Sequence, residues 1–209
     1  MNPFRPQTIF TAIFLGVIAT APCCAHAQGV EKHSERVVQA AVVVNATPAE
    51  AYRAWTTHEG ITSFFSPGAV VEAVPGGKFE IHFNPYAPPG QRGGDGLAYL
   101  ALQPDRMVSF TWNAPPSFPS VREQRTVVVV RFHPQGEKQT RVTLNEIGWG
   151  DGGEWDSTFD YFANAWPRVL ANLRMRFEKG PIDWTPRLEQ LKREMEKVKA
   201  KGEKPGKSG

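Results

Sequence analysis

Two side chains in this sequence have types and positions suited to acid–base chemistry, Glu146 and His82. Glu146 shares its strand parity with Val142 and Leu144, which directs its carboxylate toward the covered face of a predicted strand. A carboxylate that loses its water there could act as an acid or a base. The competing interpretation, which we favour, places Glu146 at the frayed end of the strand, exposed or paired with an arginine.

His82 alternates with the apolar residues of its own predicted strand, so we expect its ring to face solvent rather than a site. His33, His58 and His133 are scattered without the spacing of metal ligands. Both cysteines lie near the N-terminus and supply no thiolate to the rest of the chain. The sequence therefore predicts no metal and no cofactor, and it contains no evident catalytic motif.

One glycine-rich stretch, residues 148–153, matches the G-x-G-x-x-G pattern of dinucleotide-binding loops. It follows a predicted strand and opens a helix, but no parallel strand comes after that helix. Asp151, Glu154 and Asp156 would also place negative charge where a pyrophosphate should bind. We therefore interpret the stretch as a flexible connection between the last strand and the helix.

A long amphipathic helix is predicted over residues 155–177. Its apolar residues recur at intervals of three and four and form one stripe. They are Trp155, Phe159, Phe162, Trp166, Val169, Leu170, Leu173 and Phe177. A stripe this aromatic needs a wide cover, which a curved sheet provides better than one other helix. Pro167 lies inside the pattern and predicts a bend or local break near Ala163.

The segments before this helix supply the sheet. Residues 35–45 predict a first strand, and Thr47 to Glu50 form a capping box that starts a helix at Pro48. A second short helix is expected over residues 61–65. Six further strands are predicted at 69–74, 78–84, 96–102, 107–113, 126–133 and 140–147. Residues 85–94 and 114–123 are rich in proline and glycine and read as loops at a rim.

With no helix between the six later strands, the sheet should be an antiparallel meander. This order resembles the START/Bet v 1-like (SRPBCC) superfamily, in particular bacterial proteins similar to the activator of heat-shock-protein-90 ATPase. Four passages carry the resemblance. They are ATPAEAYRAWT at 46–56, PGGKF at 75–79, VSFTW at 108–112 and AWPRVLANL at 165–173. The resemblance implies an α+β helix-grip fold, a curved sheet of about seven strands around a long C-terminal helix.

The resemblance also implies an internal apolar cavity used for lipids, sterols, polyketides or other hydrophobic molecules, without implying one reaction. The candidate ligand-binding residues are aromatic side chains of the sheet and helices. They are Tyr52, Trp55, Phe79, Phe83, Tyr99, Phe110, Trp112, Trp155, Phe159, Phe162 and Trp166. The alternative is that these rings only pack as a core, because a filled and an empty cavity use the same residue types.

The N-terminal segment predicts a secretory signal peptide. Arg5 precedes an uncharged apolar run over residues 8–21, and Ala25-His26-Ala27 offers a cleavage site after Ala27. The run is shorter than the roughly 20 residues of a transmembrane helix. We therefore expect three parts: a signal peptide at 1–27, a helix-grip domain at 28–180, and a helical extension with a disordered basic tail at 181–209. A periplasmic or secreted location follows.

The formal net charge of +3 is small, and the tail carries part of it, so nucleic acid is not an expected partner. From Thr185 the sequence predicts another helix with a narrow stripe of Leu188, Leu191, Met195 and Val198. This helix could lie on its own domain, pair with a second copy, or rest on an anionic surface. Because positive and negative residues are mixed along this helix, an anionic membrane surface is the least favoured of these three contacts.

Three functions follow as hypotheses. The first is an exported protein that binds a small hydrophobic ligand. The second is an enzyme of the cyclase, dehydratase or hydrolase kind that uses a pocket carboxylate or histidine, Glu146 or His82. The third is a chaperone-related interaction module, against which the signal peptide counts.

Overall fold

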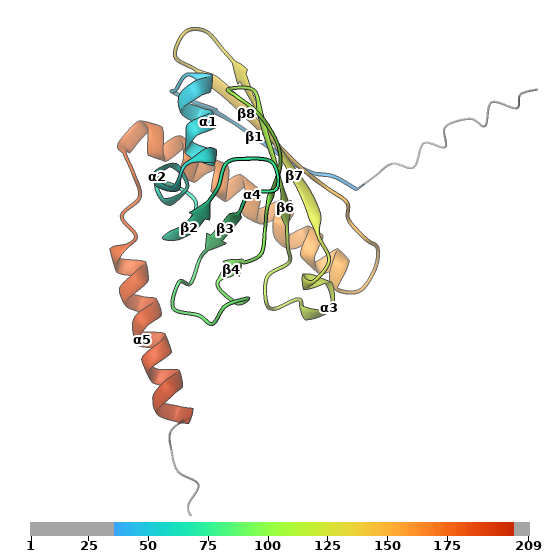
Figure 1. Ribbon diagram of the computed structural model, residues 1–209, viewed down its shortest axis with the longest axis vertical. Helices are drawn as coiled ribbons and strands as arrows, with labels where there is room; N and C mark the ends of the chain where they lie inside the picture. The colour runs from blue at the N-terminus through green and yellow to red at the C-terminus, as the bar shows by residue number, and fades with distance from the viewer. Residues whose placement is uncertain (1–35, 203–209) are drawn as a thin grey trace, which may run out of the picture. The chain divides into compact units, whose positions relative to one another are not determined.

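The computed structural model describes residues 36–202 of the 209-residue chain (Figure 1). The predicted signal peptide, its cleavage site and the end of the basic tail lie outside these residues. Within them, an α+β architecture of antiparallel sheet and long C-terminal helix confirms the predicted helix-grip fold. No helix in the described part of the chain has the length and apolar character needed to cross a bilayer.

The main sheet has five antiparallel strands in the order β1-β8-β7-β6-β5. The strands are β1 (Val38–Val44), β5 (Tyr99–Gln103), β6 (Met107–Trp112), β7 (Thr126–Pro134) and β8 (Thr140–Ile147). Alternation along β7 explains the face that each residue takes, because Val128, Val130 and Phe132 are buried while Arg131 is exposed. On β8 the same alternation buries Val142, Leu144 and Glu146.

A second, three-stranded sheet contains β2 (Gly68–Val71), β3 (Phe79–His82) and β4 (Gly93–Gly94). It is joined to the main sheet where the Phe79 amide donates to the Leu97 carbonyl at 2.9 Å and the Tyr99 amide donates to the Gly77 carbonyl at 2.9 Å. The prediction of one meander of about seven strands is therefore refined to two connected sheets. Further along, β3 pairs with β4 instead of β5, with Ile81 opposite Gly94 and His82 opposite Gly93.

Two short helices follow β1, as predicted. In α1 (Pro48–Thr56) the Thr47 hydroxyl accepts from the Glu50 amide, and the Glu50 carboxylate accepts from the Thr47 amide at 2.8 Å. This is the predicted capping box. The second helix, α2 (His58–Thr62), begins before the predicted residue 61, because the Thr57 hydroxyl accepts from the Gly60 amide at 3.0 Å and caps it.

The long helix α4 (Glu154–Lys179) runs along the main sheet and packs against β1 (Figure 1). Phe162, Trp166, Leu170 and Leu173 form its buried stripe, as the periodicity predicts. The helix is continuous through Pro167, so the predicted local break near Ala163 is wrong. Since Pro167 is exposed, its ring does not disturb the packed face.

The two segments predicted to be loops contain short regular elements. Residues 85–94 include β4, and residues 114–123 include the four-residue helix α3 (Pro119–Arg122). Pro119 stands at the start of α3, where a missing amide hydrogen is tolerated. The prediction that neither segment could form strand or helix is therefore wrong for these few residues, although both still connect larger elements.

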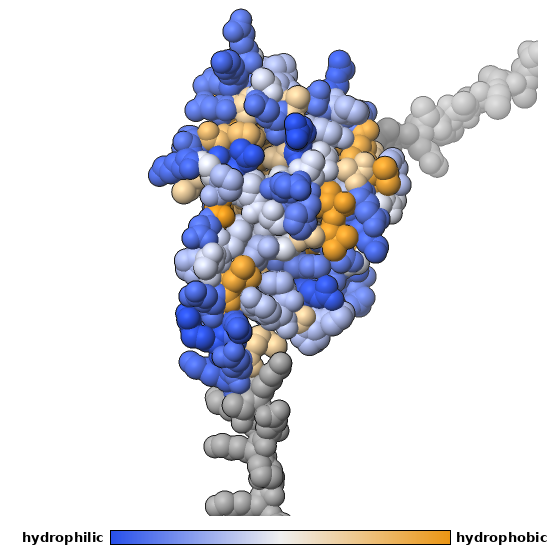
Figure 2. Space-filling model, turned by 60° about the vertical axis from the view of Figure 1, so that its left-hand side comes forward, coloured by the Kyte–Doolittle hydropathy of each residue, from blue (hydrophilic) through white to orange (hydrophobic). Residues whose placement is uncertain are grey.

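The C-terminal helix α5 (Thr185–Gly202) begins where predicted and follows a segment that is bound to α2. The Ile182 amide donates to the Ser63 carbonyl at 2.9 Å, and the Trp184 indole donates to the Thr62 carbonyl at 2.6 Å. Leu191 of α5 is buried, whereas Val198 is exposed. On the face drawn in Figure 2, hydrophobic residues form small separate areas within a mainly hydrophilic surface.

Candidate ligand-binding site

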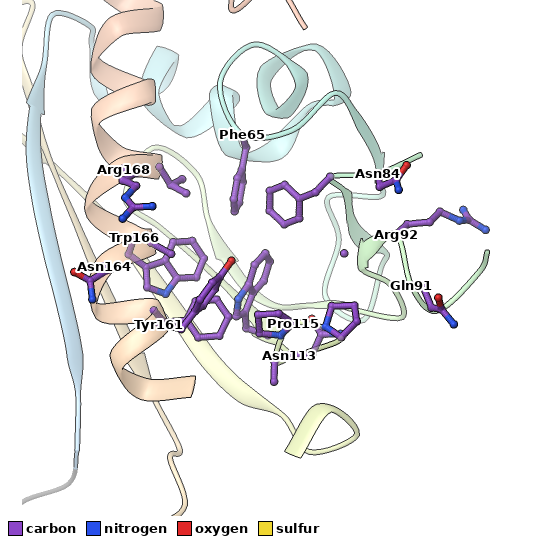
Figure 3. Close-up of a pocket in the computed structure, with 18 of the residues that line it drawn as sticks. Phe65, Asn84, Gln91, Arg92, Asn113, Pro115, Tyr161, Asn164, Trp166 and Arg168 are labelled. Carbon is purple, nitrogen blue, oxygen red and sulfur yellow. The ribbon is translucent and has the colours of Figure 1, made fainter. Parts of the chain in front are cut away.

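A cavity of about 720 Å³ lies beneath the N-terminal half of α4 (Figure 3). Its walls come from α4, the end of β6 and the connections that follow α2, β3 and β6. The lining residues are Phe65, Phe83, Asn84, Gln91, Arg92, Gly93, Trp112, Asn113, Ala114, Pro115, Pro116, Asp160, Tyr161, Phe162, Asn164, Ala165, Trp166, Arg168 and Val169. This volume is in the range of pockets that enclose a drug-sized molecule.

Five aromatic rings form a continuous wall of this cavity. Trp112 and Trp166 have ring centroids 5.1 Å apart, and Phe162 stacks on Trp166 at 5.9 Å. Phe65 contacts Trp166 at 5.8 Å and Phe83 at 5.7 Å. Rings at these separations present flat, polarizable surfaces to anything that enters. The wall therefore suits an apolar or aromatic molecule.

Local structure explains how these rings converge. Phe162 and Trp166 are four residues apart on α4 and so share one helix face. Trp112 is the last residue of β6, and Phe83 directly follows β3. Phe65 lies just after α2, ahead of the turn at residues 66–68. Each ring thus stands at an element end or on the buried helix stripe, where the chain changes direction around the cavity.

The polar residues of the lining divide into an inner and an outer set. Asn113 is only 6% exposed, while Asp160, Asn164 and Arg168 are exposed on α4. Arg92 lies 3.7 Å from Asp95, and Figure 3 shows its side chain directed away from the rings. The charged groups are therefore at the margin of the cavity.

One arginine holds together the two loops that border the cavity. The Arg122 guanidinium donates to the carbonyls of Gly90 at 2.7 Å and Gly93 at 2.9 Å, and also to the carbonyl of Ala114. Burial lowers the pKa of Arg122 from its ordinary value. At the other side, the Ser120 hydroxyl donates to the Glu154 carboxylate of α4 at 2.6 Å. The loop that carries α3 is thus bound to both sides of the cavity.

Glu146 does not line the cavity but lies behind one of its rings. It is 0% exposed, and its two carboxylate oxygens accept from the Thr126 hydroxyl at 2.7 Å and from the Trp166 indole at 2.5 Å. Burial raises the pKa of Glu146 to about 7. The favoured interpretation, an exposed or arginine-paired carboxylate, is therefore wrong. The strand does not fray here, because β8 is paired on both sides up to Glu146.

His82 is also placed differently from expectation. Its side chain shares the face of Glu80, opposite Phe79 and Ile81, but it is only 8% exposed. The imidazole Nε2 lies 3.2 Å from a Glu80 carboxylate oxygen. The expectation of a solvent-facing ring is therefore wrong. His82 is not part of the cavity lining.

Four of the candidate aromatic residues line the cavity: Phe83, Trp112, Phe162 and Trp166. Four others, Trp55, Phe79, Tyr99 and Phe110, are fully buried in the core. There the Tyr99 hydroxyl donates to the Trp55 carbonyl at 2.8 Å. Tyr52 contacts Phe132 at the edge of the core. Trp155 and Phe159 pack around Trp149 and contribute nothing to the lining.

The sequence did not indicate Phe65, Asn113 or Tyr161 as site residues. The sequence predicts Phe65 only as the end of a short helix and Asn113 only as the end of a strand. Tyr161 precedes Phe162 and is 47% exposed, so periodicity placed it outside the stripe. A detectable signal was the position of Asn113 between a strand of apolar residues and a proline-rich loop, where strand ends often carry binding groups.

The glycine-rich stretch forms a close connection between β8 and α4. Gly148, Gly152 and Gly153 have φ angles of 84°, 73° and 56°, which favour glycine. A Cβ on Gly150 would lie 2.4 Å from the Trp155 indole nitrogen, so the chain also passes too close to this ring for a side chain. Arg36 binds the Gly150 carbonyl at 3.2 Å and Asp156 at 2.6 Å. The stretch turns the chain onto α4, as the sequence suggests.

Comparison with known proteins identifies the family. The family model for Activator of Hsp90 ATPase homolog 1-like protein matches residues 45–178, more than half of the chain. The chain belongs to this family. The match spans α1 through α4 and so includes every element that surrounds the cavity. A comparison with curated proteins found no match.

Several solved structures share the fold of this family member. Protein MLL2253 from Mesorhizobium loti has a TM-score of 0.55 at 20% identity, over 70% of this chain and 100% of that one. The Aha1 dimer from Colwellia psychrerythraea has a TM-score of 0.54 at 19% identity, over 69% and 98%. PFC0360w, an HSP90 activator from Plasmodium falciparum, has a TM-score of 0.51 at 16% identity, over 70% and 97%. At these identities the likeness concerns the fold.

Proposed function

We propose that this family member is an exported binding protein that holds a small hydrophobic ligand in the cavity beneath α4. The observation that carries the proposal is the continuous aromatic wall around a space of about 720 Å³. A concave space of this size that is lined mainly by apolar and aromatic side chains, with few polar groups, is typical of sites for small ligands. Carriage, sensing and sequestration of a lipid, polyketide or aromatic compound all fit this geometry.

The positions of Glu146 and His82 support binding over catalysis. An acid–base residue has to reach its substrate directly or through one water. Both oxygens of Glu146 are occupied by Thr126 and Trp166, and neither Glu146 nor His82 lines the cavity. The second hypothesis, an enzyme of the cyclase, dehydratase or hydrolase kind, therefore lacks a reacting group among the residues first considered for it.

A chaperone-related interaction module is the third hypothesis. The Plasmodium falciparum neighbour is titled an HSP90 activator, and the Colwellia psychrerythraea neighbour is titled a dimer. These two neighbours support an interaction with a chaperone and a homodimer as alternatives for this chain, and we place the dimer contact on α5. The leader-like residues 1–27 weigh against a cytoplasmic chaperone as partner and underlie our proposal of a periplasmic or secreted location. A reporter fusion found entirely in the cytoplasm would reverse this weighting.

Native mass spectrometry of the full chain, expressed with its leader and followed by solvent extraction, tests the binding function. We expect a discrete additional mass that reappears in the extract. A polypeptide without bound compound, together with no affinity for a panel of lipids and aromatic compounds, would contradict the proposal. The mass of the chain also shows whether residues 1–27 have been removed.

Two matched variants localise the ligand. Phe83→Ala removes a cavity ring that is 40% exposed, and Leu100→Ala removes an apolar side chain that is 44% exposed and outside the lining. Loss of a ring contact should weaken binding about tenfold in Phe83→Ala and leave it unchanged in Leu100→Ala. Equal affinities in both variants would place the ligand elsewhere.

A further inference from the structure

The Asn113 side chain is a buried polar group with no protein partner. It lines the cavity, is 6% exposed, and directly follows Trp112 at the end of β6. Within residues 36–202 its amide forms no hydrogen bond. An amide has two donor hydrogens and an acceptor oxygen, and since these atoms of Asn113 are not sealed off from the cavity, a molecule that enters it can pair with them. A partner from outside the chain is therefore expected.

Other buried polar side chains of this fold show the contrast. Thr126 and Glu146 bind each other, Thr140 donates to the Ala46 carbonyl at 2.8 Å, and Ser63 donates to the Gly60 carbonyl at 2.6 Å. Three enclosed atoms of the described chain lack a partner, Trp55 Nε1, Trp112 Nε1 and Thr158 Oγ1. The Asn113 amide is not among these enclosed atoms, so it stays accessible from the cavity.

The surroundings of Asn113 are aromatic and uncharged. Figure 3 shows Asn113, Pro115 and Tyr161 at one end of the cavity and Phe65 at the other. The Tyr161 ring packs edge-on to Phe162 at 5.0 Å, and its hydroxyl has no hydrogen bond within the described residues. The charged lining residues are marginal, since Arg92 is close to Asp95 while Asp160 and Arg168 are exposed. The Arg122 guanidinium lies near Asn113 on the Ala114 carbonyl, but it is not part of the lining and its terminal nitrogens already donate to the carbonyls of Ala114, Gly90 and Gly93.

We infer, resting on the proposed function above, that the ligand is an uncharged compound with a flat ring system whose polar oxygen is hydrogen-bonded by the Asn113 side chain. The rings of Trp112, Phe162 and Trp166 supply the stacking surfaces, and the amide fixes the orientation of the ligand. A flexible acyl chain without a polar group would leave the amide unpaired. An anionic compound would lose its hydration, and the Arg122 guanidinium that could compensate for this loss already donates to three carbonyls.

Three naphthalene probes of nearly equal size test this assignment on the full chain, with affinities measured by isothermal titration calorimetry. 2-Acetylnaphthalene is uncharged and carries an acceptor oxygen, 2-ethylnaphthalene lacks the oxygen, and 2-naphthoate is anionic at pH 7.5. We expect 2-acetylnaphthalene to bind about tenfold more tightly than either of the others. Equal affinity for 2-acetylnaphthalene and 2-ethylnaphthalene, or a preference for 2-naphthoate, would overturn the inference.

A variant pair assigns the preference to one side chain. Asn113→Leu keeps the branched shape and the number of side-chain heavy atoms but removes the amide, so it should abolish the preference for 2-acetylnaphthalene over 2-ethylnaphthalene. Asn172→Leu removes a partly exposed amide of α4 outside the lining and should keep the preference. A preference that survives in folded Asn113→Leu would overturn the assignment. Should Asn113→Leu fail to fold, Asn113→Ala supplies the same comparison, because it also lacks a side-chain polar group.

The outcomes separate this inference from the proposed function. If native mass spectrometry finds a bound compound but none of the three naphthalenes binds, the ring class is wrong while the cavity still has a ligand. If neither experiment detects binding, the proposed function fails as well. Binding of 2-acetylnaphthalene that depends on Asn113 supports both.

Discussion

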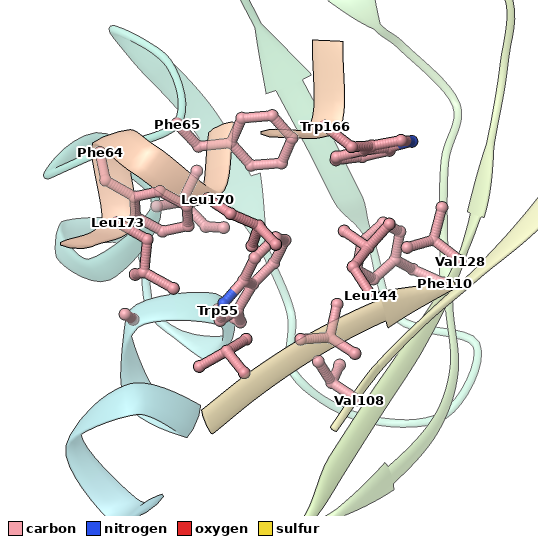
Figure 4. Close-up of a cluster of buried hydrophobic side chains, with 14 of the residues drawn as sticks. Trp55, Phe64, Phe65, Val108, Phe110, Val128, Leu144, Trp166, Leu170 and Leu173 are labelled. Carbon is pink, nitrogen blue, oxygen red and sulfur yellow. The ribbon is translucent and has the colours of Figure 1, made fainter. Parts of the chain in front are cut away.

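The two ends of α4 pack against the same sheet but enclose different interiors. Toward its C-terminal end, Leu170 and Leu173 meet Trp55 and Phe64 in a filled core (Figure 4). Toward its N-terminal end, Phe162 and Trp166 border a cavity of about 720 Å³. Both ends are rich in aromatic residues. The composition of the helix stripe therefore does not decide whether the space beneath it is filled.

The covering segments account for the difference. The filled end is closed by α1 and α2, whose Trp55 and Ile61 are fully buried and occupy the space between helix and sheet. The other end is bordered by connections that contribute Gly93, Ala114, Pro115 and Pro116 to the cavity lining. These side chains are too small to reach across to α4. A helix that inserts large side chains fills the space, and a loop of small residues leaves it open.

The largest expected effect is on the filled end. Trp55→Ala removes a fully buried ring that contacts Phe64 and Phe110, so the free energy of unfolding should fall by about 3–5 kcal/mol. Phe83→Ala, at the hollow end, should reduce it by about 1 kcal/mol, because that ring is partly exposed. Urea denaturation of both variants measures the contrast. Equal losses would mean that the two ends are packed alike.

The second effect concerns the carboxylate behind the cavity wall. The pKa of Glu146 is about 7 in the folded chain against an ordinary value of 4.5. Because the folded pKa is the higher one, this group stabilises the fold fully below pH 4.5, and that stabilisation is lost as pH rises through about 7. The change amounts to about 3 kcal/mol.

Glu146→Gln keeps the side-chain shape and cannot ionise. The difference in unfolding free energy between the native chain and this variant should therefore change between pH 5 and pH 8, by about 2.5 kcal/mol. Denaturation at several pH values, with both proteins in the same buffers, removes the contribution of other carboxylates. A constant difference over this range would show that Glu146 has the same protonation in the folded and unfolded chain.

The smallest stability effect is expected at the loops of the hollow end. Arg122→Lys replaces a planar fork bound to three carbonyls with a single ammonium group, so stability should fall by about 1 kcal/mol. Ligand dissociation should become several-fold faster, because the two bordering loops are no longer held together. Stopped-flow displacement of a fluorescent ligand measures this rate.

Arg125→Lys is the matched control for that measurement. The Arg125 guanidinium binds the carbonyls of Arg122 and Gln124 within its own loop and reaches neither the Gly90 nor the Gly93 carbonyl. Its substitution should leave the dissociation rate unchanged. If the two variants released ligand at the same rate, the contact between the loops would not govern exchange.

Most of the fold could be predicted because its signals are local. The capping box at Thr47, the alternation of the strands and the three- and four-residue spacing on α4 each depend on residues that are neighbours in sequence. The boundaries that were wrong also have local causes. The helix α2 starts earlier than predicted because the Thr57 hydroxyl caps it. The helix α3 is a single turn within a proline-rich loop, which the loop prediction did not include.

The site was predicted less completely, because it depends on where elements meet. Parity directed Glu146 to the covered face, but the identity of its partners, Thr126 and Trp166, required β7, β8 and α4 to be placed together. Aromatic composition alone predicts core rings and cavity rings equally as ligand-binding residues. Phe79 and Phe110 are core residues, whereas the rings that line the cavity are Phe83, Trp112, Phe162 and Trp166. Nothing in the sequence near Asn113 showed that its amide would remain without a partner.

The sequence by itself determined the order of elements, the buried stripe of α4 and the loops that border its N-terminal half. Only the tertiary structure decided which aromatic rings are sealed and which face a cavity. The physical reason is that periodicity assigns each side chain to a face, whereas packing depends on the volume that distant segments bring to that face. Trp55 of α1 and Ile61 of α2 fill one end, and the loops leave the other end open.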